Sequence, residues 1–75
     1  MVLNRVIGIL SDFLYVDPDE IYDDTSLFME YDLDDSDVDE IISKLESEFD
    51  VEINRNDFLE LDTVQDIVEY IEEQL

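Results

Sequence analysis

One serine lies among aspartates in the segment Leu33-Asp34-Asp35-Ser36-Asp37. The apolar spacing that follows predicts that a helix begins here. The Ser36 hydroxyl would then lie at the positive end of the helix dipole, where a covalently attached phosphate is stabilised. The chain holds no His, no Cys and only three basic residues, so nothing in it could activate Ser36 as a nucleophile. We therefore expect that the chain is not an enzyme, and that any chemistry at Ser36 is done to it by another enzyme.

The acidic residues around Ser36 indicate a binding surface. The spacing Asp35-x-Asp37-x-Asp39 with Glu46 at the twelfth position is similar to a calcium-binding loop. However, the sixth position is Glu40, where the sharp turn of such a loop needs Gly, so the sequence predicts no specific metal site. We expect Asp35, Asp37, Glu40 and Glu46 to contact basic patches on protein partners.

Helical periodicity predicts the elements that position these residues. Apolar residues recur every three or four positions over about residues 2–15, and again in a second main helix that starts near Asp35 or Ser36. The segment Ser36-Asp37-Val38-Asp39 is interpreted as a variant capping box for this second helix. Asn54 or Asn56 is expected to cap a short helix, and Asp62-Thr63 a last one.

A long loop is expected over roughly residues 22–34, and its apolar side chains predict that it packs on the core. No alternation of apolar and polar residues lasts long enough to form a sheet. The expected fold class is all-α: a small four-helix bundle of three main helices and one short helix, with the long loop after helix one. A single domain is expected to cover residues 1–75.

The composition narrows the class of protein. With 45% hydrophobic residues, the 75 residues are sufficient for one modest core. The 24 acidic and three basic residues give a net charge of −21, which excludes nucleic-acid binding through phosphates and favours partners with basic surfaces. The absence of Cys excludes disulfides and thiolate zinc sites. The apolar N-terminal stretch is too short to span a membrane, so we expect a cytoplasmic monomer with no membrane partner.

Several segments match a known family in both order and spacing. They are VDPDEI at residues 16–21, DTSL at 24–27, DDSD at 34–37, and the more specific LESEFDVEI at 45–53 and TVQDIVEYI at 63–71. On these segments, the chain resembles bacterial acyl carrier proteins over essentially its whole length. The fold of that family is a four-helix bundle with a long loop after helix one, in agreement with the periodicity.

The resemblance implies that the chain is a carrier. In the family, a serine is esterified to 4′-phosphopantetheine, whose terminal thiol holds an acyl chain as a thioester, and the apolar interior can shelter part of that chain. Carried over to this sequence, the attachment residue is Ser36 and the cofactor is covalent 4′-phosphopantetheine. The implied partners are a phosphopantetheinyl transferase and acyl-handling enzymes of fatty acid or polyketide biosynthesis, whose basic patches contact acidic residues of the second main helix.

The attachment motif differs from the family pattern by one residue. The family serine precedes a helical Glu by five positions, and counting back from Glu40 reaches Asp35, whereas the Asp-Ser pair itself indicates Ser36. In the first register, three usually apolar positions of the family are polar: Ser36, Asp39 and Ser43. Two hypotheses stay open: a carrier modified at Ser36, or an acidic protein-binding module without phosphopantetheine that has Asp35 at the serine position. A third, an acidic mimic of nucleic acid, fits only the charge.

Overall fold

The three longest helices are those that the apolar periodicity predicts. In the computed structural model, which describes residues 1–75, α1 spans Val2–Leu14, α3 spans Asp35–Phe49 and α5 spans Val64–Glu72. Each helix buries one face because its apolar side chains recur at three- and four-residue spacing. The structure contains no strands, so the all-α fold class is confirmed. No helix has the length and apolar character needed to cross a membrane.

Three short elements connect the long helices. They are the 3₁₀ helix η1 (Pro18–Glu20), the one-turn helix α2 (Leu27–Glu30) and helix α4 (Arg55–Leu59). Helix α2 lies within residues 22–34, for which the sequence predicts a loop. It forms because Leu27 is buried and the Phe28 ring packs edge-on against Phe58 of α4, with centroids 6.1 Å apart and planes at 80°.

The chain between η1 and α3 is held against the start of α5. The backbone N–H of Val64 donates to the carbonyl of Thr25 at 2.9 Å, and that of Gln65 donates to the carbonyl of Asp23 at 2.8 Å. The Ser26 hydroxyl donates to Asp62 Oδ1 at 2.8 Å. These bonds, together with buried Ile21 and Leu27, confirm that this segment packs on the core.

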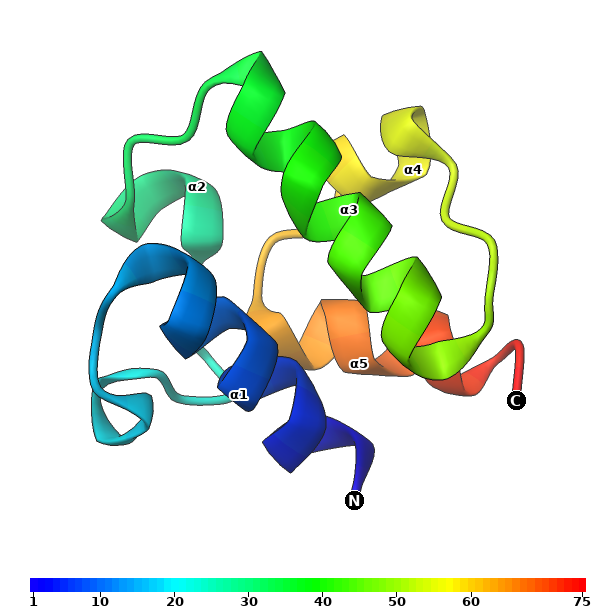
Figure 1. Cartoon of the computed structure of the whole chain (residues 1–75), viewed down its shortest axis with the longest axis horizontal. Helices are drawn as coiled ribbons and strands as arrows, with labels where there is room; N and C mark the ends of the chain where they lie inside the picture. Colours follow the sequence, from blue (N-terminus) through cyan, green and yellow to red (C-terminus); the bar gives the residue numbers. More distant parts are fainter.

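Helices α1 and α3 lie side by side and run in opposite directions. Figure 1 shows both crossing the molecule diagonally, with α5 crossing near the C-terminal end of α3. Arg5 of α1 joins the C-terminal end of α3, since its guanidinium contacts Glu48 Oε2 at 2.8 Å and lies 4.5 Å from the centroid of the Phe49 ring. One cluster of 15 buried apolar residues lies inside this frame, and all five α-helices contribute to it, together with Ile21 and Ile53 of the connecting segments.

Candidate functional site at the start of helix α3

Asp34, and not Ser36, caps helix α3. Asp34 has an extended backbone (φ −91°, ψ 178°), and its Oδ1 accepts a hydrogen bond from the Asp37 N–H at 2.8 Å. In return, Asp37 Oδ2 accepts from the Asp34 N–H at 3.1 Å, which completes a capping box. The predicted box from Ser36 to Asp39 is therefore wrong by two positions. The carboxylate of Asp34 accepts from the Asp37 N–H, so this helix start needs no cap from Ser36. Ser36 is the second residue of the helix.

Ser36 is exposed in the first turn of this 15-residue helix. The hydrogen bonds around it join Asp34 to Asp37 and Asp35 to Arg55, and none involves the Ser36 hydroxyl. The hydroxyl is thus available to an external reactant. The helix start also gives a phosphate on this oxygen a favourable electrostatic position, because the N-terminal end of a helix carries partial positive charge.

Arg55 of α4 binds two aspartates beside Ser36. Its Nε donates to Asp39 Oδ1 at 2.8 Å and its Nη2 donates to Asp35 Oδ1 at 3.1 Å. The hydrogen bonds that Arg55 donates to Asp39 and to Asp35 raise the pKa of its guanidinium above its usual value, so its charge is permanent at any physiological pH. Asp35 and Asp39 lie one turn apart, so both point from α3 toward the start of α4.

Sequence reasoning missed the role of Arg55. The only signal in the sequence was the rarity of basic residues. Arg55 is one of three basic residues among 24 acidic ones, so an ion pair with a carboxylate was to be expected, but not with which one. Its partners lie 16 and 20 residues away in sequence, and local patterns do not identify such pairs.

The four predicted partner-binding carboxylates occupy different environments. Asp35 pairs with Arg55, and Asp37 completes the helix cap. Glu46 Oε2 accepts a hydrogen bond from the Ile53 N–H at 2.8 Å, so it orders the link between α3 and α4. Glu40 alone is exposed and makes no hydrogen bond within the chain. A role of these residues in partner binding stays a prediction, and Glu40 is the one most free to take it.

The helical geometry of α3 places the side chains of Asp35 and Ser36 on different sides of the helix. The helix is continuous from Asp35 to Phe49, and its buried face consists of Val38, Ile41, Ile42, Leu45 and Phe49. Consecutive residues on a helix point about 100° apart. Asp35 faces Arg55 and α4, whereas Ser36 points to another side of the same turn. The two registers of the attachment motif therefore place the reactive position on different sides of α3.

Comparisons with known proteins indicate the family to which the chain belongs. Residues 4–71 match the family described as "Phosphopantetheine attachment site". The acyl carrier protein of Bdellovibrio bacteriovorus is 36% identical over 70 residues, which cover 93% of this chain and 90% of that protein. The acyl carrier protein of Thermosynechococcus vestitus is 37% identical over 70 residues, covering 93% and 86%. That of Thermotoga maritima is 32% identical over 74 residues, covering 99% and 91%.

A helical bundle that these relatives match over nearly its whole length defines the class of phosphopantetheine carrier proteins. The chain belongs to the acyl carrier protein family. Members of this family are carriers and not enzymes, and their prosthetic group is covalently attached 4′-phosphopantetheine. The exposed hydroxyl of Ser36 at the positive end of α3 fits a phosphodiester of this kind.

Proposed function

We propose that this chain carries an acyl or related group as a thioester on 4′-phosphopantetheine attached to Ser36. The supporting observation is the exposed Ser36 hydroxyl, free of internal hydrogen bonds, in the first turn of α3. A transferase would join this oxygen to the phosphopantetheine phosphorus of coenzyme A. The pyrophosphate bond breaks, 3′,5′-adenosine bisphosphate leaves, and the serine proton passes to the transferase or to solvent. The thiol of the attached group then holds the acyl chain.

Neighbouring residues support attachment at this position. Asp34 and Asp37 bind the free N–H groups of the helix start, which leaves the Ser36 hydroxyl available. Arg55 offsets the charge of Asp35 and Asp39, the two carboxylates on the side of α3 that faces α4. This reduces the repulsion that an incoming phosphate would meet beside two unpaired carboxylates.

The proposal extends to the partners and the state of the protein. A transferase and acyl-handling enzymes with basic patches would meet a chain of net charge −21, and the encounter would be fast and sensitive to salt. We propose that the chain acts in the cytoplasm. We also propose that it is a monomer, because self-repulsion at this charge opposes association with a second copy. Light scattering coupled to size exclusion at physiological salt would test the monomer.

The test of attachment is modification in vitro. The apo-protein is incubated with a broad-range phosphopantetheinyl transferase and coenzyme A, and intact mass is measured. We expect one added phosphopantetheine in the protein without substitutions and none in Ser36→Ala. Ser43→Ala is the matched control, because Ser43 is another exposed serine on α3, and it should be modified normally. Modification mapped to any other serine, or none with either a broad-range transferase or one from the native source, would refute the proposal.

The alternative is an acidic protein-binding module that bears no phosphopantetheine. It is favoured by Asp35, which lies five positions before Glu40, begins the uninterrupted helix α3 and is held in an ion pair with Arg55. The variant Asp35→Ser separates the two functions. If Asp35 stands at the serine position, the original chain stays unmodified and Asp35→Ser gains one phosphopantetheine at residue 35. If Ser36 is the site, the original chain is already modified.

A further inference from the structure

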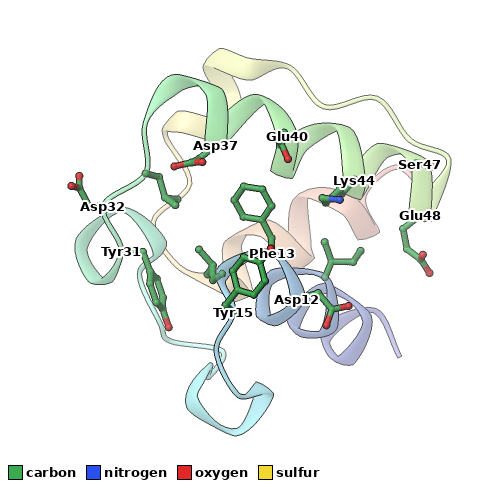
Figure 2. Close-up of a pocket in the computed structure, with 13 residues that line it drawn as sticks. Asp12, Phe13, Tyr15, Tyr31, Asp32, Asp37, Glu40, Lys44, Ser47 and Glu48 are labelled. Atoms are coloured by element: carbon green, nitrogen blue, oxygen red, sulfur yellow. The ribbon is translucent and has the colours of Figure 1, made fainter.

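Arg55 is the only basic side chain placed to meet a negative group on Ser36. Arg5 is bound to Glu48 at the opposite end of α3. Lys44 comes two turns after Ser36, about 12 Å further along the helix axis. It lines the groove between α1 and α3, and Figure 2 shows it on the side of α3 that faces α1. Any counter-charge that this chain supplies to a phosphate on Ser36 therefore comes from α4.

The guanidinium of Arg55 lies against the part of α3 that adjoins Ser36. Its Nε donates to Asp39 at 2.8 Å and its Nη2 donates to Asp35 at 3.1 Å. At about 100° per residue, Asp39 comes between Asp35 and Ser36 around the helix, about 60° from the serine. Asp39 also follows Ser36 by three positions, a spacing that makes two side chains neighbours on a helix surface. A group on the Ser36 oxygen thus lies next to a carboxylate that Arg55 already contacts.

Arg55 has donors for a further acceptor. A guanidinium has five N–H groups, of which two bond here to the aspartates, so the other three make no hydrogen bond within the chain. The contact with Asp35 is the weaker one, because it is longer and the Asp35 side chain is 97% exposed, against 64% for Asp39. Exchanging Asp35 for another anion therefore costs little. Phosphate is well suited to replace it, since a guanidinium binds two phosphate oxygens through parallel N–H groups.

We propose that Arg55 is a positioning residue for the prosthetic group: it binds the phosphate ester on the Ser36 oxygen, releasing Asp35 and keeping Asp39. This inference rests on the attachment at Ser36 that is proposed above. The shared guanidinium offsets the repulsion between the phosphate and the Asp39 carboxylate. It also holds the start of the phosphopantetheine arm on the side of α3 that faces α4, which restricts the directions in which the arm leaves the molecule.

The first test needs no substitution. Arg5 and Arg55 are the only arginines, so the full chain with isotopically labelled arginine gives two side-chain Nε–H signals in an NMR spectrum. The spectrum is recorded before and after transfer of phosphopantetheine from coenzyme A, with the modification confirmed by intact mass. We expect the Arg55 signal to shift and its guanidinium protons to exchange more slowly with water, while the Arg5 signal stays unchanged. A modified chain with an unchanged Arg55 signal would overturn the inference.

The second test examines the phosphate contact without a transferase. The full chain is synthesised with phosphoserine at residue 36, and its phosphate is titrated by phosphorus NMR. Because a nearby guanidinium favours the doubly charged phosphate, Arg55→Gln should raise the proton affinity of the phosphate about three-fold. Arg5→Gln is the matched control, since it removes the same charge at the far end of α3 and should have a much smaller effect. Equal effects of the two variants would show that the phosphate senses only net charge.

The third test concerns the exchange of partners in the phosphopantetheine-bearing chain. Modification should raise the midpoint of thermal unfolding by about 2–5 °C, and Arg55→Gln should abolish this rise. Asp35→Asn should keep the rise or enlarge it, because Arg55 then leaves no carboxylate when it binds the phosphate. A rise that survives in Arg55→Gln, or that is lost in Asp35→Asn, would overturn the inference.

The tests also separate this inference from the proposed function. If the chain accepts phosphopantetheine but the Arg55 variant behaves like the Arg5 control, the carrier function stands and the positioning role of Arg55 is refuted. If no transferase modifies the chain, the carrier function and the positioning of the arm both fail. An effect of Arg55 in the phosphoserine chain would then show a phosphate contact alone.

Discussion

At the scale of single residues, two positions carry positive φ without being glycine: Tyr15 at 57° and Asp50 at 54°. Both end a long helix, and the left-handed turn lets the following N–H bond to a carbonyl of the last turn: Val16 N–H to Ser11 at 3.1 Å and Val51 N–H to Glu46 at 3.4 Å. The left-handed conformation costs an L-residue about 1–2 kcal/mol, and Asp tolerates it better than most because its short side chain bonds locally. No hydrogen bond of the Tyr15 side chain offsets this cost, so the backbone at the end of α1 is strained at this residue.

Replacing Tyr15 by Gly should stabilise the free chain. The left-handed backbone no longer clashes with a Cβ, and this gain exceeds the extra chain entropy of Gly by about 0.5–1 kcal/mol. Urea unfolding monitored by circular dichroism would measure the change. Tyr22→Gly is the control, because Tyr22 is also exposed but has no positive φ, and it should be neutral or destabilising. A loss of stability in Tyr15→Gly would contradict this explanation of the helix end.

The start of α3 allows a matched pair of substitutions two residues apart. Asp34→Ala should lower the free energy of unfolding by about 1 kcal/mol, because it removes the side chain that accepts from the Asp37 N–H. Ser36→Ala should change it by less than about 0.5 kcal/mol, since the hydroxyl makes no bond that the fold requires. Chemical denaturation of both variants checks this. A larger cost for Ser36→Ala than for Asp34→Ala would restore Ser36 as the cap.

At the scale of elements, the sequence predicts well whatever depends on local periodicity and capping chemistry. The three long helices appear as expected, and so do the caps at Asn54 and Thr63, whose side chains accept from the N–H three residues on. Helix α2 could not be predicted, because four residues are too few to show a period and its stability comes from Phe28 packing on Phe58. The predicted position of the cap of α3 was wrong for another reason. Successive Asp and Ser residues can all cap a helix, so their residue types do not indicate which one does.

The candidate site was predictable only in part, because local sequence patterns do not show contacts between separate elements. The exposed Ser36 at a helix start and the exposed Glu40 follow from the amphipathic pattern of α3. The pairing of Asp35 and Asp39 with Arg55, and the bond from Ile53 to Glu46, are contacts made through space between separate elements. A pattern that assigns a residue to the solvent side of a helix does not show which distant group it meets.

Helix α1 contains the only glycine of the chain, and nothing in the fold requires it. A Cβ built on Gly8 would meet no atom within 4 Å, and the residue has no positive φ. Gly8→Ala should therefore raise the free energy of unfolding by about 0.5–1 kcal/mol, because Ala has the higher helix propensity and restricts the unfolded chain. The same denaturation measurement tests it. A destabilised Gly8→Ala would show that the side of α1 next to η1 is more crowded than the structure indicates.

At the scale of the whole molecule, charge and size have to be considered together. The chain extends over 27 × 27 × 19 Å and bears a net charge of −21. At 0.01 M salt the screening length is about 30 Å, so every carboxylate is repelled by nearly every other, whereas at 0.15 M it is about 8 Å and only neighbours interact. The three ion pairs are exposed and engage only two of the basic residues, so they offset little of this repulsion.

Stability should therefore rise steeply with ionic strength. Between about 0.01 and 0.15 M NaCl we expect the midpoint of thermal unfolding to rise by at least about 5 °C, which for a chain of this size corresponds to about 1 kcal/mol. Magnesium chloride at equal ionic strength should stabilise more, because divalent cations gather near dense carboxylates. The double variant Glu72→Gln, Glu73→Gln is the matched control: both residues are exposed at the C-terminal end of α5, where no basic residue offsets the helix dipole. It should be more stable than the original chain at low salt, and the difference should vanish at high salt, since screening and removal of charge relieve the same repulsion. Melting curves that do not respond to salt in either protein would show that repulsion among carboxylates does not limit the stability of this fold.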